Sequence, residues 1–153
     1  MRIVIASSEA VPFAKTGGLA DVASALGKAL SGLGHQVWVV LPHYPQLLPR
    51  KQSLPIESTG ITFPVPIGAR AMDARILWSN LPDSNVTYLL VDQPAYFNRA
   101  SLYQERGRDY DDNCERFCFF SRAVVELCRR MVLRPDVIHA NDWQTALIPA
   151  LLK

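Results

Sequence analysis

The chain has 153 residues, of which 49% are hydrophobic and 20% charged, with a formal net charge of +2. This composition is that of one globular domain, and it gives no support for a nucleic-acid-binding surface, an acidic tail or a membrane-spanning segment. Met1 and Arg2 lead directly into an apolar run without a secretory signal or transit peptide, which predicts a cytoplasmic protein.

The first predicted unit is a strand, a glycine turn and a helix. Residues 2–7 are almost continuously apolar, as in a central parallel strand that is covered on both faces. After a loop over 8–18, apolar residues at helical spacing predict a helix over 19–33 that ends at Gly34. The predicted buried stripe of this helix comprises Leu19, Val22, Leu26, Leu30 and Leu33.

The turn before this helix is a candidate anion site. Gly17 and Gly18 leave backbone N–H groups at the helix start, where the peptide dipoles favour negative charge, and Lys15 adds a cation. Neither common glycine-rich phosphate motif occurs here, and paired glycines before a helix also serve tight strand-to-helix packing. From the spacing alone, the packing interpretation is slightly favoured.

The middle of the chain predicts further strands. Residues 36–41 complete a right-handed βαβ unit, and residues 42–55 form a loop without a clear period. Residues 61–65 and 74–78 predict two shorter strands joined by a turn at a glycine, and two prolines place the first of them at an edge. Residues 86–91 predict another buried strand.

An irregular segment over 94–110 follows, with tyrosines interleaved with arginines. It lies at the carboxyl end of a strand, where open α/β sheets bind ligands, and Phe97 is expected to pack the loop down. Residues 111–113 then begin a long helix with carboxylates and a capping side chain at its positive end, and Arg129 and Arg130 lie at its end. Its predicted buried stripe comprises Cys114, Phe117, Cys118, Ser121, Val124, Val125, Cys128 and Val132.

The three cysteines are confined to this helix, which is not a disulfide framework. No histidine lies near them to complete a metal site, so they are expected to be buried thiols. Residues 137–140 predict a short buried strand in which His139 is a core residue. Asp142 follows, where it can serve as the N-cap of a last helix.

Two blocks carry a resemblance to a known family. Residues 8–13 and 15–22, with the string K-T-G-G-L-A-D-V, resemble the amino terminus of bacterial glycogen synthases and plant starch synthases. Residues 136–147, D-V-I-H-A-N-D-W-Q-T-A-L, resemble the strand and D-W element of the same family. The resemblance covers essentially the whole chain but only the first part of such an enzyme.

The resemblance implies an α/β fold, in which a mostly parallel Rossmann-like sheet has helices on both faces. Residues 1–153 would be the amino-terminal half of a glycosyltransferase-B fold, truncated before its end. The family transfers glucose from ADP-glucose, or UDP-glucose, to the non-reducing end of an α-1,4-glucan with retention and without a metal. Because the family's T-x-H-N segment and carboxyl-terminal domain are absent, this chain alone is expected to be inactive, with a strand missing beside residues 137–140.

The resemblance also implies the site residues, although no catalytic set is complete. The donor and phosphate side would comprise Lys15, Thr16, Gly17, Gly18 and Asp21. The acceptor-glucan side would comprise Glu9, Tyr103, Asp142, Trp143 and Gln144. Two alternatives stay open: a stand-alone glucan- or nucleotide-binding module, and a phosphorylase-like enzyme of the same architecture. A flavodoxin-like regulator is less favoured than either, because the sequence provides no acidic phosphorylation pocket.

Overall fold

The computed structural model describes residues 1–49, 54–82 and 84–153, so residues 50–53 of the expected loop over 42–55 lie outside it. The strands of the main sheet are β1 (Arg2–Ala6), β2 (Gln36–Pro42), β3 (Glu57–Ile67), β4 (Arg70–Asn80), β5 (Thr87–Asp92) and β8 (Val137–Ala140). Within the described residues these six strands lie in the order β3-β4-β5-β2-β1-β8. β8, β1, β2 and β5 are parallel, whereas β4 and β3 are antiparallel to their neighbours. The predicted mostly parallel sheet is confirmed.

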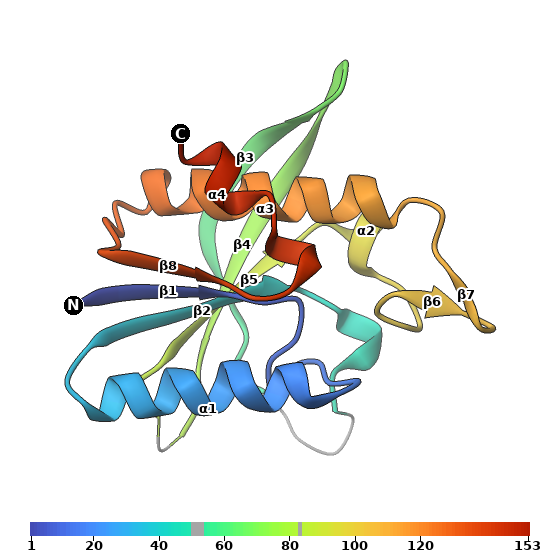
Figure 1. Cartoon of the computed structure of the whole chain (residues 1–153). Coiled ribbons are helices and arrows are strands. Elements are labelled where there is room, and N and C mark those ends of the chain that lie inside the picture. Colours follow the sequence, from blue (N-terminus) through green and yellow to red (C-terminus); the bar gives the residue numbers. More distant parts are fainter. Residues whose placement is uncertain (50–53, 83) are drawn as a thin grey trace.

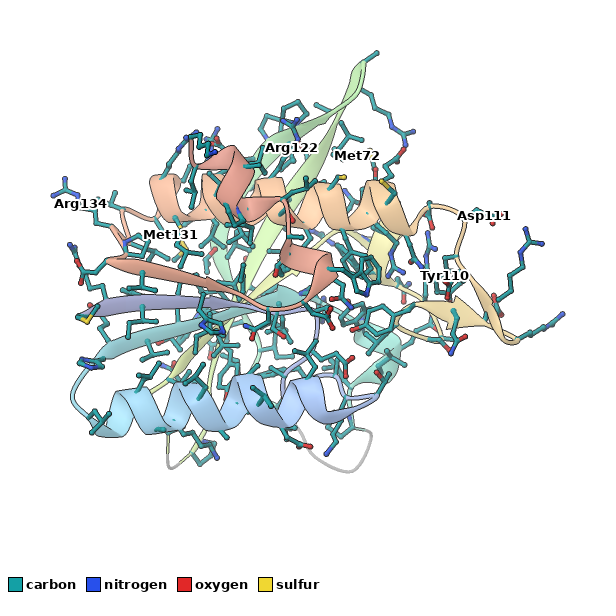
Figure 2. All side chains as sticks on the ribbon, viewed as in Figure 1. Met72, Tyr110, Asp111, Arg122, Met131 and Arg134 are labelled. Carbon is teal, nitrogen blue, oxygen red and sulfur yellow. The ribbon has the colours of Figure 1, made fainter. Side chains whose placement is uncertain are left out.

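Helices cover both faces of the sheet. Helix α1 (Gly18–Gly32) lies on one face, and α3 (Asn113–Arg130) and α4 (Ile148–Leu151) lie on the other, as Figure 1 shows. Alternate residues of β1 serve the two layers: Ile3 and Ile5 pack on the α1 side, and Val4 and Ala6 pack on the α3 side. Figure 2 shows side chains filling the space between the sheet and both helical layers. This packing explains why β1 is apolar throughout.

The predicted buried stripe of α1 is right only in part: Leu26 and Leu30 are partly buried and pack against the core, but they lie beside the fully buried face. The buried residues of the helix are Ala20, Ala23, Ser24 and Gly27. Val22 and Leu33, both predicted to be buried, are 57% and 74% exposed. Small residues face the sheet because the helix packs closely: a Cβ at Gly27 would lie 3.2 Å from Val39 Cγ2. The leucine pattern therefore misplaced the packing face.

The hairpin of β3 and β4 is longer than the two short strands expected. Each strand has 11 residues, and the turn between them contains Gly68 with a φ of 59°. β3 is the outermost strand, as its prolines indicate: Pro64 and Pro66 are exposed, and a missing N–H is tolerated there. The edge position is confirmed.

Helix α3 has the predicted extent, but its cysteines differ from expectation. Cys114 is exposed and Cys118 is half-buried, whereas Cys128 is buried. The buried face is broader than predicted and includes Phe119 and Phe120, which are fully buried against the sheet. Val132, also predicted to be buried, is exposed. The prediction of three buried thiols is therefore wrong for the first two.

The last elements are shorter and more exposed than predicted. β8 is the outermost strand at its end of the sheet, and Val137 and His139 are exposed, so neither the buried strand nor the core histidine is found. A 3-10 turn, η2 (Trp143–Thr145), and the four-residue α4 replace the single last helix.

Three short elements lie in the segments expected to be loops. The turn η1 (Pro45–Leu47) follows β2, and α2 (Pro94–Phe97) follows β5. A small hairpin of β6 (Gln104–Glu105) and β7 (Arg108–Asp109) then leads to α3. Phe97 is fully buried, as expected for a residue that packs its loop down.

Candidate functional site

The site lies where the chain leaves the carboxyl ends of β1 and β8. These two parallel strands are neighbours, and the Asn141 backbone N–H and side-chain Nδ2 both donate to the Ala6 carbonyl at 3.0 Å. The chain leaves β1 toward α1 on one face and leaves β8 toward α4 on the other (Figure 1). Such a divergence opens a crevice at the sheet edge, where α/β proteins bind ligands.

A cavity of about 570 Å³ occupies this position. Seven of the ten predicted site residues line it: Glu9, Gly17, Gly18, Tyr103, Asp142, Trp143 and Gln144. The predicted donor and acceptor sides therefore meet in one cavity, although they come from three distant parts of the chain. Thr16 contacts Glu9 behind the lining, whereas Lys15 and Asp21 lie outside it.

Gly17 and Gly18 are open toward this cavity. A Cβ built on either glycine would meet nothing within 4 Å, so tight strand-to-helix packing does not require glycine at these positions. Gly17 is the N-cap of α1 and has an extended backbone, with no side chain capping the helix. The start of α1 thus has space beside its glycines and no capping side chain, as an anion site requires.

Glu9 organises the loop before α1 through four hydrogen bonds. Its carboxylate accepts from the Thr16 N–H at 2.5 Å, the Thr16 hydroxyl at 2.7 Å and the Gly17 N–H at 3.4 Å. It also accepts from the Tyr103 hydroxyl at 2.7 Å. Glu9 is 3% exposed, and all four donors are uncharged. A buried carboxylate therefore occupies part of the anion-binding surface of this turn.

Lys15 is paired with Asp21, the acidic residue in the first turn of α1. Lys15 Nζ lies 2.7 Å from both carboxylate oxygens, and the two side chains are 52% and 57% exposed. An ion pair in this setting contributes at most about 1 kcal/mol. Its cation can therefore be transferred to an incoming anion at little cost.

Tyr103 connects the acceptor side to this loop. Its hydroxyl lies 2.7 Å from Ser8 Oγ and donates to Glu9, and burial is the main reason that its pKa is raised. Its ring lies 6.0 Å from the Trp143 ring, centre to centre, and Trp143 stands edge-on to Phe117 at 5.1 Å. Trp143 is 51% exposed, so these rings form an apolar wall that a ligand can reach.

Asp142 and Gln144 have unusual local environments. Asp142 has φ 62° and ψ −177°, a conformation that non-glycine residues rarely adopt, and its carboxylate accepts from the Trp143 N–H at 2.7 Å. The N-cap interpretation of Asp142 is thus confirmed for η2. Gln144 is 3% exposed, yet its Oε1 has no hydrogen-bond partner in the described part of the chain. Strained backbone and an unused buried acceptor are features that occur at functional sites.

The sequence analysis missed three residues of the site. Ser8 is fully buried and bonds Tyr103, Asn141 joins the two strand ends, and Arg116 is a fully buried arginine on α3. The last of these had a sequence signal, since a charged residue stands among the aromatic residues of the helix. The Asp112 carboxylate lies at the start of α3 as expected, but it makes no capping hydrogen bond there and is paired with Arg99 at 2.5 Å.

The described residues contain no group of three or more potential metal ligands. In the same residues, no helix has the length and apolar character needed to cross a membrane. His139, at the exposed edge, is hydrogen-bonded to Asn141 Oδ1 at 3.1 Å.

Known proteins resemble this chain over its whole length. The family model described as the starch synthase catalytic domain matches residues 2–153. A glycogen synthase of Elusimicrobium minutum is 47% identical over 154 residues, covering 100% of this chain and 31% of that protein. A glycogen synthase of Rhodopirellula baltica is 43% identical over 162 residues, covering 100% and 32%. The chain thus spans about a third of the length of these relatives.

One solved structure extends the comparison. The catalytic domain of starch synthase IV from Arabidopsis thaliana, bound to ADP and acarbose, aligns with a TM-score of 0.84 and 30% identity. The alignment covers 97% of this chain and 29% of that chain.

Proposed function

Because the chain belongs to the starch synthase catalytic domain family, we propose that it is the first part of an enzyme that elongates an α-1,4-glucan. In this proposal glucose moves from ADP-glucose, with UDP-glucose as the alternative donor, to the non-reducing end of the glucan with retention. The expected family and its partial glycosyltransferase-B fold are confirmed by the family model and the starch synthase IV alignment. The single domain over 1–153 and the cytoplasmic location stay predictions.

One observation carries the proposal: the open glycines at the start of α1 share a cavity with carboxylates and aromatic rings. On the donor side, a diphosphate would accept hydrogen bonds from the amides of the Gly17–Gly18 turn and take Lys15 from Asp21. These groups would oppose the negative charge that develops on the leaving nucleoside diphosphate, and preorganised donors stabilise such a transition state. No metal is needed for that role in this proposal.

The acceptor side suits sugar hydroxyls. Asp109 and Asp142 supply carboxylates to the cavity lining beside Glu9, and hydroxyl groups donate to carboxylates. Gln144 also lines the cavity, although its Oε1 is buried and has no hydrogen-bond partner among the described residues. Trp143 provides a half-exposed indole on which the apolar face of a sugar ring can lie.

The test compares the full-length protein with the polypeptide of residues 1–153. Incorporation of labelled glucose from ADP-glucose or UDP-glucose into glycogen or a maltooligosaccharide is measured for both. We expect incorporation by the full-length protein, faster with ADP-glucose, and none by residues 1–153. Elongation by residues 1–153 would contradict the need for further chain, and inactivity of folded full-length protein with both donors would contradict the proposed reaction.

One observation favours the alternative of a stand-alone binding module: this chain forms the cavity by itself. Titration calorimetry of residues 1–153 with maltooligosaccharide and with ADP separates the two functions. Micromolar binding of either ligand by residues 1–153, together with a lack of transferase activity in the full-length protein, would support the binding module instead.

A further inference from the structure

Arg116 is fully buried on α3, next in sequence to Phe117, and does not itself line the cavity. None of the ion pairs among the described residues includes it, and its Nε and Nη2 have no hydrogen-bond partner there. Aromatic rings surround the guanidinium instead: its carbon lies 5.3 Å from the ring centres of Phe97 and Tyr110 and 5.0 Å from that of Phe117. A buried, unpaired charge is unfavourable, so its retention calls for an explanation.

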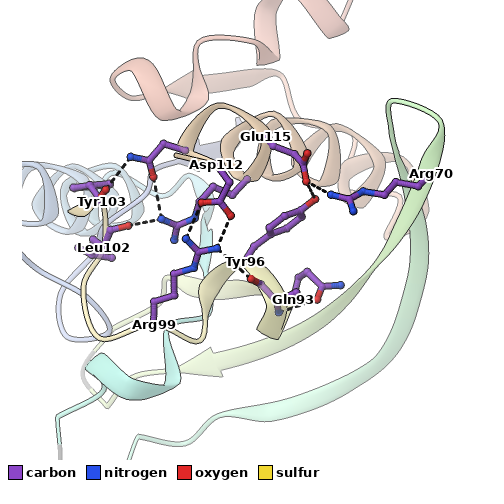
Figure 3. Close-up of polar contacts among 11 residues, drawn as sticks. Arg70, Gln93, Tyr96, Arg99, Leu102, Tyr103, Asp112 and Glu115 are labelled. Carbon is purple, nitrogen blue, oxygen red and sulfur yellow. Dashed lines mark hydrogen bonds and ion pairs between the residues drawn. The ribbon is translucent and has the colours of Figure 1, made fainter. Parts of the chain in front are cut away.

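The one hydrogen-bonding nitrogen of Arg116 points at the segment that carries Tyr103. Arg116 Nη1 donates to the Leu102 carbonyl at 2.8 Å and to Asn113 Oδ1 at 3.1 Å. Asn113 Nδ2 in turn donates to the Tyr103 carbonyl at 2.8 Å. Figure 3 shows these bonds converging on Leu102 and Tyr103 from the start of α3. The helix thus holds two successive carbonyl groups of this segment.

The same segment reaches the glycine turn through the side chain of Tyr103. The Tyr103 hydroxyl bonds Glu9, and Glu9 bonds the Thr16 and Gly17 amides. We propose that Arg116 is a positioning residue that fixes Tyr103, and through Tyr103 and Glu9 the amides of the turn before α1. This inference rests on the proposed donor-binding function of that turn and adds the residue that sets its geometry.

Arg99 provides the matched control, because it anchors the same loop by a different route. It is paired with Asp112 and its guanidinium lies 4.6 Å from the Tyr110 ring centre, yet it bonds neither Leu102 nor Tyr103. Figure 3 shows Arg99 and Asp112 facing each other. If Arg116→Met acted only by loosening the loop in general, Arg99→Met would therefore have the same effect.

The first measurement is amide hydrogen exchange in the full-length protein, which does not depend on activity. In Arg116→Met, the Thr16 and Gly17 amides should exchange about tenfold faster, the factor expected for loss of one hydrogen bond. Tyr103→Phe should produce the same change, and Arg99→Met should leave these amides at the wild-type rate. Unchanged exchange of these amides in folded Arg116→Met, or equal acceleration in Arg99→Met, would overturn the proposal.

The second measurement is a double-mutant cycle on kcat/KM for the nucleotide-sugar. Arg116→Met and Tyr103→Phe should each lower kcat/KM about tenfold, and the double variant should lose no more than the larger single effect, because both act through one path. Arg99→Met should instead combine multiplicatively with Tyr103→Phe. Multiplicative effects of Arg116→Met and Tyr103→Phe would overturn the proposal.

Two further variants keep the test decisive if Arg116→Met does not fold. Arg116→Lys retains the charge and one donor for the Leu102 carbonyl, so it should show a smaller acceleration of the Thr16 and Gly17 amides than Tyr103→Phe. Wild-type exchange in Tyr103→Phe would overturn the proposal by itself. A full-length protein without transferase activity whose amides respond as predicted would contradict the proposed function and leave the positioning role supported.

Discussion

At the scale of single residues, two carboxylates occupy the hydrogen-bond donors and the cation near the start of α1. Glu9 accepts hydrogen bonds from two of the loop's amides, and Asp21 holds the ammonium of Lys15. Both carboxylates contact groups that a diphosphate would use. In the proposed function, a diphosphate that binds at this loop would therefore replace these carboxylates, and the exposed Lys15–Asp21 pair is the easier of the two interactions to open.

Lys15→Met should separate binding from stability. The lysine is half exposed, so its loss should change the free energy of unfolding by less than about 1 kcal/mol. In the full-length protein kcat/KM for the nucleotide-sugar should fall about 30-fold or more, since a charge-assisted hydrogen bond contributes about 2 kcal/mol or more. Asp21→Asn is the control that frees the cation, and a loss as large as that of Lys15→Met would contradict the anion-exchange interpretation.

Asp142 combines backbone strain with a side-chain hydrogen bond, and two variants separate them. Asp142→Ala loses the bond to the Trp143 N–H and keeps the unfavourable φ of 62°, whereas Asp142→Gly loses the bond and relieves the strain. Chemical denaturation should find Asp142→Gly more stable than Asp142→Ala by about 1 kcal/mol or more. Equal stability of the two variants would mean that the conformation carries no strain.

The sequence could predict the candidate site residues that occur in recognisable strings. It missed the residues whose contacts form only in the tertiary structure. Gly17, Gly18, Glu9 and the D-W residues were found because they stand in two local blocks. The contact of Tyr103 with Glu9 joins residues 94 positions apart, so no local pattern reports it. The position of Arg116 is of the same kind, since its burial depends on three rings that the tertiary fold assembles.

At the scale of elements, α1 is defined by how closely it approaches the sheet. Its buried face consists of small residues, and its leucines lie at the margins or in solvent. Hydrophobic periodicity predicted the helix and its ends correctly, because Gly17 and Gly34 bound it. It misplaced the packing face because close packing against Val39 selects Ala and Gly, which carry little hydrophobic signal. The strands of the β3 and β4 hairpin were predicted too short for a related reason, since their ends are exposed and polar.

The two ends of α1 provide a matched pair of glycines. Gly18 and Gly32 are both helical and a Cβ at either would meet nothing within 4 Å. Gly→Ala at each should leave the fold intact and raise the free energy of unfolding by up to about 1 kcal/mol. Only Gly18→Ala should lower kcat/KM for the nucleotide-sugar, because its methyl group would stand between the amides and the phosphates.

Thermal unfolding and steady-state kinetics of the two full-length variants test this expectation. Wild-type kinetics in Gly18→Ala would show that no ligand approaches that part of the turn. A similar kinetic loss in Gly32→Ala would indicate that the whole helix, rather than its amino terminus, responds to the added methyl group.

At the scale of the whole molecule, different interactions stabilise the faces and the carboxyl edge of the sheet. Apolar layers cover the two faces, on the α1 side and on the α3 side. At the carboxyl edge, ion pairs join separate elements. Asp92, at the end of β5, is hydrogen-bonded to His43 Nδ1 at 2.9 Å and paired with Arg75 of β4 at 2.5 Å. This cluster joins the parallel strands to the antiparallel hairpin away from the proposed site.

The Asp92 cluster predicts how the stability of the molecule depends on pH. Burial alone would raise the pKa of Asp92, but the hydrogen bond and charge of His43, together with Arg75, hold the pKa below its usual range. A carboxyl with a depressed pKa stabilises the fold above its unfolded pKa of about 4, and this contribution is lost as the pH falls through the folded value.

Asp92→Asn should therefore lower the free energy of unfolding by about 1–3 kcal/mol at pH 7, and the deficit should shrink toward pH 3. Asp111→Asn, which changes an exposed carboxylate, should stay within about 0.5 kcal/mol of the wild type throughout. Urea unfolding of all three proteins between pH 3 and pH 7 measures these differences, and a constant deficit for Asp92→Asn would show that the residue acts through packing instead of charge.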